Sequence, residues 1–258
     1  MLIKAAINGG RAKAEHAAVP ISPDEQAAAV VACLKAGADA IHLHVRFVGA
    51  ARSSRSYAEG LVSEKESLHA EDVAGTLLVV KAVAPNAPIG VSTGAWILPD
   101  PVARLRAVAA WKVLPGFASV NFSEEGAVDL AKLLLSRGVD VEAGLCDADA
   151  AQVFVRCGLG ARCIRVLLEP QEQELERALE TVGAIERVLT SGAPDLPPLL
   201  LHGTEATVWP MMDEAIARGY DVRTGLEDTL VLPDGRVARD NVELISEAVR
   251  RGRARGER

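Results

Sequence analysis

The fold is decided by the stretch Lys35-Ala36-Gly37-Ala38-Asp39-Ala40-Ile41-His42-Leu43-His44-Val45, which joins the end of an expected helix to a short apolar strand. A basic last turn followed at once by glycine is typical of a helix that closes with a left-handed residue. The same ending recurs at Ser136-Arg137-Gly138, Arg156-Cys157-Gly158 and Ala217-Arg218-Gly219. Three of the four endings are quickly followed by a short strand, as in a repeating β/α unit.

Short apolar runs alternate with longer amphipathic runs along the 258 residues. The apolar runs predict strands at 2–8, 40–45, 89–92, 118–121, 139–142, 163–167, 199–202 and 221–224. The amphipathic runs predict helices at 23–36, 70–84, 100–112, 125–137, 147–157, 171–190, 207–218 and 240–251. Strict alternation of eight strands and eight helices over about 250 residues indicates an α/β protein with a (β/α)8 TIM barrel. An open doubly wound sheet is the structural alternative, which the lack of GxGxxG after the first strand weakens.

Composition and charge exclude several classes of protein. The chain is 49% hydrophobic and 24% charged, which is typical of a soluble globular protein. Its 35 acidic and 28 basic residues give a net charge of -7, and aromatic residues make up only 3%. Both values disfavour a nucleic-acid partner, which requires clustered basic and stacking side chains. No stretch approaches the ~18 apolar residues of a membrane span, and we expect no signal peptide.

The four cysteines, at positions 33, 146, 157 and 163, form no CxxC pair and no disulfide framework. Cys33 and Cys146 lie in apolar runs, where a buried free thiol is expected. We therefore expect a protein of the reducing cytoplasm. We further expect a single domain over 1–258 that forms a homo-oligomer, either a dimer or a tetramer.

Two segments interrupt the β/α rhythm. Residues 46–69 form a long polar stretch, which we interpret as a loop at the carboxyl-terminal face of the barrel, where active sites are built. Residues 252–258 are a basic tail without apolar periodicity, which predicts a frayed terminus.

The most informative side chains for chemistry are the two histidines of Ile41-His42-Leu43-His44-Val45. Alternate residues of a strand share a face, so both imidazoles are expected to point into the barrel near its mouth. Two buried histidines need partners. A divalent metal ion, for which imidazole is a good ligand, satisfies both. A pair of core histidines bonded to backbone or water is the alternative.

A catalytic zinc site has three protein ligands and one open position, so a third ligand should come from another strand end. The candidates are Glu227 and Asp228, which follow the last expected strand, and His202, which ends the one before it. A solvated turn is the alternative interpretation of Glu227 and Asp228.

Other strand ends are also polar: Ser92-Thr93-Gly94 follows the third strand, Asn121 and Ser123 the fourth, and Glu142 the fifth. Each alone is typical of a helix cap or turn. Together, at successive strand ends, they indicate a shared polar cavity.

These residues resemble the β-keto acid cleavage enzymes, a family whose founding activity cleaves 3-keto-5-aminohexanoate. The resemblance covers nearly the whole chain. It is carried by IHLHVR at 41–46 and RTGLED at 223–228, with NG at 8–9, PISPDE at 20–25, STG at 92–94 and SVN at 119–121. The paired elements HLHxR and RxGxED, in this order, are specific.

The resemblance implies a TIM barrel with a zinc ion held by His42, His44 and Glu227. It implies that a β-keto acid and acetyl-CoA give acetoacetate and a new acyl-CoA through condensation and a retro-Claisen step. In such a reaction zinc acts as a Lewis acid that stabilises enolate charge. Asp228 would be the base or part of a base relay, and Arg223 would hold the substrate carboxylate.

The same resemblance gives Ser92, Thr93 and Asn121 the task of positioning the substrate and bonding developing oxyanions. The chain departs from the family pattern in the long 46–69 segment. It departs again at Arg11, in a region where members acting on the amino substrate carry a glutamate.

The departure at Arg11 bears on the substrate. If this cation faces the cavity, it repels an ammonium group, and we expect a preference for β-keto acids with anionic or neutral tails. Glu15 or Glu142 would meet an ammonium group if that preference is wrong.

Two other functions remain open. Amidohydrolase-like enzymes also use HxH with a late acidic residue, but on the first strand and with further barrel histidines or a lysine. Here the motif lies on the second strand, and of the other histidines only His202 ends a strand. A noncatalytic zinc-binding barrel is the second alternative, against which the presence of Arg223, Glu227 and Asp228 argues.

Overall fold

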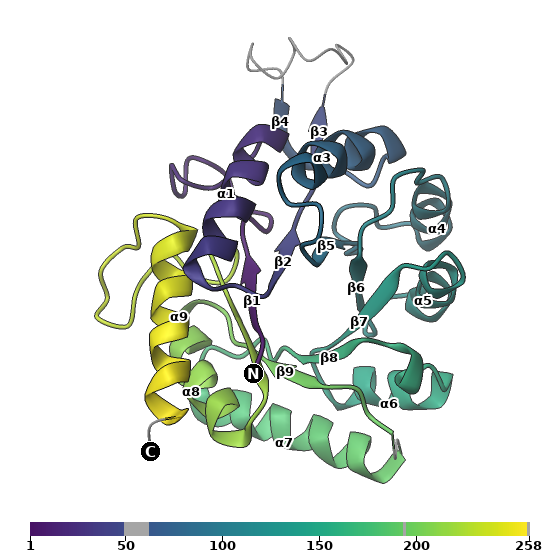
Figure 1. Ribbon diagram of the computed structural model, residues 1–258. Helices are drawn as coiled ribbons and strands as arrows, with labels where there is room; N and C mark the ends of the chain where they lie inside the picture. Colours follow the sequence, from purple (N-terminus) through teal and green to yellow (C-terminus); the bar gives the residue numbers. More distant parts are fainter. Residues whose placement is uncertain (49–61, 193–194, 257–258) are drawn as a thin grey trace.

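The computed structural model describes residues 1–48, 62–192 and 195–256. Within them, eight parallel strands close into a barrel in the order β1-β10-β9-β8-β7-β6-β5-β2 (Figure 1). The barrel strands are β1 (Ile3–Ala6), β2 (Ala40–Leu43), β5 (Ile89–Ser92), β6 (Phe117–Asn121), β7 (Asp140–Leu145), β8 (Arg165–Leu168), β9 (Leu199–Leu201) and β10 (Asp221–Thr224). The predicted (β/α)8 barrel is confirmed.

Helices surround the barrel and follow its strands in turn (Figure 1). They are α1 (Pro23–Ala36), α3 (Ala70–Val83), α4 (Pro101–Ala109), α5 (Ala127–Ser136), α6 (Ala148–Cys157), α7 (Leu175–Gly192), α8 (Val208–Arg218) and α9 (Asn241–Gly256). Short 3-10 turns, η1 (Gly160–Arg162) and η2 (Glu205–Thr207), precede β8 and α8. No helix in the described part of the chain combines the length and apolar character needed to cross a membrane.

The helix ends explain why the sequence alternates so regularly. Ser22 caps α1 in a capping box with Glu25, and Pro23 occupies the first helical position. Gly37 closes the helix with a φ of 109°, and the chain enters β2 three residues later. The predicted helix-to-strand joint is therefore confirmed at the stretch that defined it.

Two predicted segments differ in the structure. Within 46–69, β3 (Arg46–Val48) pairs antiparallel with β4 (Val62–Glu66), and only 49–61 lies outside the described residues. The prediction of a loop throughout was wrong, because β3 is only three residues long and β4, with the sequence VSEKE, is mostly polar, so that neither shows an apolar alternation. The tail predicted to begin at residue 252 was also wrong, since α9 continues to Gly256. Adding residues to an existing helix is far easier than starting one.

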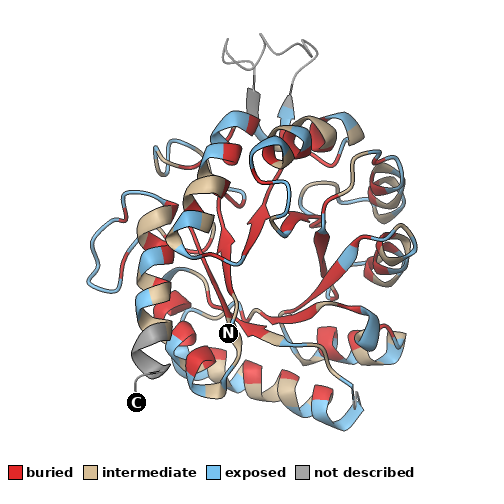
Figure 2. Ribbon diagram, in the orientation of Figure 1, coloured by how far each residue is buried: buried red, intermediate tan, exposed pale blue. Residues whose placement is uncertain are grey.

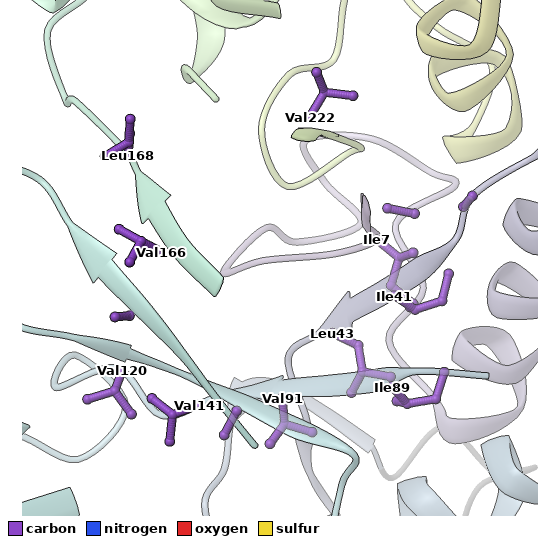
Figure 3. Packing of buried hydrophobic residues seen from close by; sticks show 14 of the residues in the cluster. Ile7, Ile41, Leu43, Ile89, Val91, Val120, Val141, Val166, Leu168 and Val222 are labelled. Atoms are coloured by element: carbon purple, nitrogen blue, oxygen red, sulfur yellow. The ribbon is translucent and has the colours of Figure 1, made fainter. Parts of the chain in front are cut away.

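The apolar core lies between the barrel and its helices. Every barrel strand is largely buried, whereas the helices mix buried and exposed residues (Figure 2). Residues from successive strands, among them Ile41, Leu43 and Ile89, belong to one continuous cluster (Figure 3).

The barrel interior contains buried charged side chains. Lys4 on β1 contacts Glu142 on β7, two strands on opposite sides of the closed order, so this ion pair crosses the interior. Side chains that alternate with the apolar ones therefore point inward.

Candidate active site

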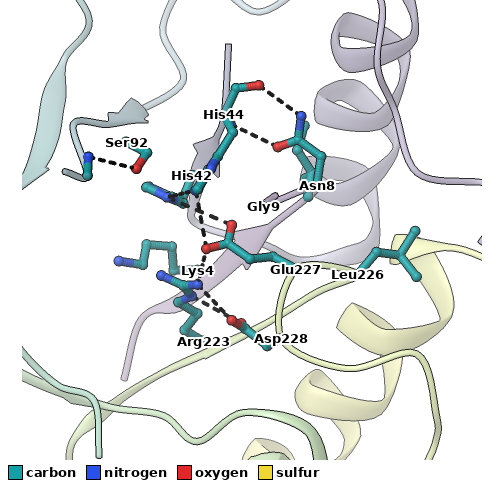
Figure 4. Close-up of polar contacts among 12 residues, drawn as sticks. Lys4, Asn8, Gly9, His42, His44, Ser92, Arg223, Leu226, Glu227 and Asp228 are labelled. Atoms are coloured by element: carbon teal, nitrogen blue, oxygen red, sulfur yellow. Dashed lines mark hydrogen bonds and ion pairs between the residues drawn. The ribbon is translucent and has the colours of Figure 1, made fainter. Parts of the chain in front are cut away.

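The two histidines of β2 lie together at the mouth of the barrel. His42 belongs to the strand and His44 follows it directly, and their Nε2 atoms are 3.1 Å apart (Figure 4). Their rings meet edge to face, with centroids 5.0 Å apart. Ile41 and Leu43 belong to the apolar core. The alternation predicted from the sequence places both imidazoles on the side of the cavity.

The turn after β10 brings Glu227 over these histidines. A side chain at Gly225 would place its Cβ 2.0 Å from the carbonyl oxygen of Ala6, so only glycine lets the turn pass this close to β1. Gly9, with a φ of 51°, likewise leaves room for the side chain of Glu227. The backbone N–H of Glu227 donates to Ala6 at 3.2 Å, which fixes the turn.

His42, His44 and Glu227 together suit a metal ion. Each offers one ligand atom, and these atoms all lie within 4.8 Å of one another. Glu227 approaches His44 Nε2 at 3.3 Å and His42 Nε2 at 3.8 Å, and its buried Oε2 has no hydrogen-bond partner among the described residues. Two imidazole nitrogens and a carboxylate oxygen are typical ligands of zinc. The residues present therefore fit the implied metal.

The electrostatics of the three residues are strongly coupled. Burial lowers the pKa of His42 well below its usual value, an effect that nearby Glu227 only partly opposes. Burial also disfavours charge on His44, but Glu227 and Glu66 outweigh it and raise its pKa to about 9. Burial opposes ionisation of Glu227, yet Arg223 and the histidines hold its pKa well below the ordinary range. The site thus keeps Glu227 as a carboxylate.

Arg223 on β10 links Glu227 to Asp228. Its Nε donates to Asp228 Oδ2 at 3.0 Å, and its Nη2 donates to Asp228 Oδ1 at 2.6 Å and also to Glu227 (Figure 4). Burial disfavours the Arg223 cation, but the two carboxylates reverse this and raise its pKa. Asp228 is only 1% exposed. The guanidinium therefore holds both carboxylates in fixed orientation.

These residues line a cavity of about 380 Å³ at the carboxyl ends of the strands. Ser92 and Asn121, which end β5 and β6, lie on its wall. His202 after β9 and Glu169 after β8 lie on it as well, 3.4 Å apart between Nε2 and Oε2. His202 thus lies beside Glu169, although its Nε2 has no hydrogen-bond partner among the described residues. The group of close ligand atoms contains Glu227 as the third member. The structure brings most of the predicted strand-end residues to one cavity.

Three predicted substrate-binding residues are not among the described residues that line this cavity. Thr93 is buried and donates to the carbonyl oxygen of Ser119 at 2.6 Å. Glu142 is fully buried in the barrel, bound to Lys4 and Arg165. β7 continues to Leu145, so Glu142 does not stand at a strand end as the sequence predicted.

Arg11 is the third of these residues. Its guanidinium contacts Glu205 and, at 3.2 Å, Glu15, and its Nε donates to the carbonyl oxygen of Glu227 at 3.3 Å. Arg11 and Glu15 thus form an ion pair with each other, and neither is among the described residues that line the cavity. The preference for anionic or neutral substrate tails, which assumed Arg11 inside the cavity, loses its structural basis.

The sequence analysis missed several residues at the site. Glu169 follows β8 as Asn121 ends β6, so the same strand-end reasoning could have found it. Ser119 lies two residues before Asn121 on one face of β6 and also lines the cavity. Glu66 and Trp96 gave no periodic signal, because both reach the site from segments outside the barrel strands.

The fold and site together define a TIM-barrel protein with a candidate metal centre where its strands end. The family model described as beta-keto acid cleavage enzyme matches residues 1–258, and the chain belongs to this family. The family assignment made from the sequence is confirmed.

Solved structures of ObcA are similar to this chain. Its binary complex with oxaloacetate matches with 18% identity and a TM-score of 0.67, covering 92% of this chain and 64% of that one. Its ternary complex with a C4-CoA adduct and oxalate matches with 19% identity and a TM-score of 0.69, again covering 92% and 64%. This chain thus spans less than two thirds of ObcA.

A more distant barrel shows how general the fold is. The alpha subunit of tryptophan synthase from Legionella pneumophila str. Paris matches with 11% identity and a TM-score of 0.56, covering 98% of this chain and 93% of that one. At such identities, as for ObcA, the likeness shows the fold alone.

Proposed function

We propose that this protein cleaves a β-keto acid with acetyl-CoA as co-substrate, releasing acetoacetate and a new acyl-CoA. The observation that carries the proposal is the cluster of His42, His44 and Glu227 beside the Arg223–Asp228 pair in one cavity. Family membership supports it, and so do the oxaloacetate and CoA-adduct complexes of the structurally similar ObcA.

We further propose that His42, His44 and Glu227 hold zinc, whose nitrogen and oxygen ligands they match. A zinc ion supplies Lewis-acid stabilisation of the negative charge that develops on a keto oxygen. The remaining chemistry belongs to the side chains around it.

Asp228 takes the proton from the carbon between the two carbonyl groups, or relays it. Its two hydrogen bonds to Arg223 fix its orientation for this task. These bonds use Nε and Nη2 of Arg223, so that Nη1 can hold an oxygen of the substrate carboxylate. Ser92 and Asn121, which line the cavity, would donate to developing oxyanions.

The proposed reaction has two steps, a condensation and a cleavage. The enolate carbon forms a bond to the acetyl carbonyl carbon, and the thiolate of CoA leaves. That thiolate then attacks the original keto carbon, whose bond to the enolate carbon breaks, and the released enolate of acetoacetate takes back the proton that Asp228 removed. The products are acetoacetate, which contains the acetyl group, and the acyl-CoA of the substrate tail.

An assay with isotopically labelled acetyl-CoA tests this proposal. Metal-loaded protein is incubated with the labelled thioester and 3-keto-5-aminohexanoate, a dicarboxylic β-keto acid or an aliphatic one. We expect labelled acetoacetate and an unlabelled new acyl-CoA by mass spectrometry, and formation of both products slowed by roughly 100-fold or more with Asp228→Asn.

The same assay distinguishes the other functions. An amidohydrolase-like enzyme would transfer no label to acetoacetate, and a noncatalytic zinc barrel would bind metal and turn over no β-keto acid. Either result would overturn the proposal. The cytoplasmic location and homo-oligomeric state expected from the sequence stay predictions.

A further inference from the structure

A carboxylate from outside the barrel contacts the candidate metal ligand His44. Glu66, the last residue of β4, binds Nδ1 of His44 through its Oε1. The other ring nitrogen, Nε2, faces Glu227 at 3.3 Å and His42 at 3.1 Å. The imidazole thus has Glu66 on one nitrogen and the candidate metal cluster on the other.

Trp96 completes this arrangement. Its indole N–H donates to both carboxylate oxygens of Glu66, at 3.2 and 3.0 Å, and its ring stacks on His44 with centroids 6.1 Å apart and planes inclined by 21°. Trp96 is 56% exposed, which is unusual for a large aromatic side chain. Its contacts with Glu66 and His44 explain why it is held there.

Strand pairing and hydrogen bonds to backbone carbonyl groups hold the segment that carries Glu66. Arg46, which ends the HLHVR motif, is paired with Glu66 in the β3–β4 ribbon. Its buried guanidinium donates to the carbonyl oxygen of Glu64 at 3.0 Å and to that of Arg11 at 3.1 Å. The N–H of Ser67 donates to Val45 at 2.9 Å. The ribbon therefore delivers the Glu66 carboxylate at a fixed place.

The two candidate histidine ligands differ in this respect. Nδ1 of His42 is buried and has no hydrogen-bond partner in the described part of the chain, whereas Nδ1 of His44 is bound to Glu66. A carboxylate on the remote nitrogen of a metal-binding histidine fixes its tautomer and ring orientation. Of the two, only His44 has this support.

We propose that Glu66 is a positioning residue for His44. It holds the ring proton on Nδ1 and turns Nε2 toward His42 and Glu227, and Trp96 holds Glu66 in place. The inference rests on the metal site of the proposed function. It assigns to the β3–β4 ribbon the role of supporting the metal centre.

Zinc affinity of the metal-free protein is the primary test. Glu66→Ala should weaken zinc binding by about 10–100-fold, the usual effect of losing such a partner, and Glu66→Gln should lie between it and the parent. The matched control is Glu64→Ala, on the same strand, whose exposed side chain accepts from the N–H of Lys13. It should bind zinc like the parent.

Three spectroscopic measurements distinguish positioning from general loss of structure. Circular dichroism and melting temperature should be unchanged in Glu66→Ala. A long-range proton–nitrogen correlation spectrum of the zinc-loaded parent should place the proton of His44 on Nδ1. Zinc binding should also change the fluorescence of Trp96, and Trp96→Phe should abolish that change, because Trp111 and Trp209 are not among the described residues that line the cavity.

The outcomes separate the inference from the proposed function. If Glu66→Ala binds zinc as tightly as the parent, or if the His44 proton lies on Nε2, the positioning role is overturned while the metal site stands. If the parent itself binds no zinc, the metal site of the proposed function fails and the positioning role fails with it.

Discussion

Two groups of buried ionisable side chains lie inside this barrel, and they differ in how completely their polar atoms are paired. In the deeper group, Lys4 binds Glu142 at 2.6 Å, and Arg165 binds both Glu142 and Asp221. No buried side-chain atom of these four residues lacks a hydrogen-bond partner among the described residues.

The group at the barrel mouth is less complete. His42 Nδ1 and Glu227 Oε2 are buried without hydrogen-bond partners in the same described segments. Unpaired buried polar atoms cost free energy, so their presence beside the cavity supports the metal site proposed there. We therefore infer two different roles: the deeper charges stabilise the barrel, and the side chains at the mouth bind the proposed metal ion.

The largest effect should follow from removing the mouth group's nitrogen ligands. A protein with both His42→Ala and His44→Ala should lose bound zinc and turnover entirely and stay folded, because the deeper ion pairs remain. Metal analysis, the labelled acetyl-CoA assay and circular dichroism measure the three properties. The control is His69→Ala, an exposed residue without a side-chain capping bond. Undiminished zinc in the double variant would refute the assigned ligands.

The second-largest effect should distinguish the roles of two carboxylates at the barrel mouth, Glu227 and Asp228. Glu227→Gln should lose zinc, whereas Asp228→Asn should keep zinc and lose rate by roughly 100-fold or more, as loss of a general base commonly does. Both carboxylates bind Arg223, so both variants disturb the same cation. Zinc content and kcat measured side by side decide the matter. Equal metal loss in both would contradict the division of roles.

The third effect concerns the deeper group. Glu142→Gln leaves Lys4 and Arg165 without their shared carboxylate, and breaking such a buried pair costs about 3–5 kcal/mol. Urea unfolding should detect this loss in the free energy of unfolding, with zinc affinity unchanged. Asp140→Asn, at an exposed position of the same strand, is the matched control. A Glu142→Gln protein as stable as the parent would remove the structural role.

Much of this organisation could be predicted from the sequence. The joint ending in Gly37 predicted where α1 stops and β2 starts, because a left-handed cap and a two-residue alternation are local properties. The same alternation placed His42 and His44 on one face. The closure of the barrel then brought Glu227 to them from the far end of the chain, as the strand order required.

Depth along the barrel axis could not be predicted in this way. Alternation indicates that Glu142 and Asn121 both point inward, but not how high each lies. In the register of β6 with β7, Asn121 stands opposite Gly144, so Glu142 lies two residues deeper. The partner of His44 was also missed, because Glu66 reaches it through a polar antiparallel ribbon that has no periodic signature.

The smallest expected effect is the pH dependence of stability that Glu142 contributes in the deeper group. Burial opposes ionisation of Glu142, but Lys4 and Arg165 outweigh it and lower its pKa below the ordinary 4.5. Its charge therefore stabilises the fold fully above pH 4.5. As the pH falls below 4.5, the unfolded chain takes up the proton first, and this contribution disappears as the folded pKa is passed.

The difference in unfolding free energy between the parent and Glu142→Gln should accordingly be constant from pH 7 to about 5 and shrink below 4.5. Taking the difference removes groups common to both proteins, such as Glu243, whose bond to Arg236 lowers its pKa to about 2. Urea unfolding of both proteins at several pH values measures it. A difference that stays constant down to pH 3 would mean that Lys4 and Arg165 do not hold Glu142 ionised, and the contrast between the two buried groups would then lose its electrostatic basis.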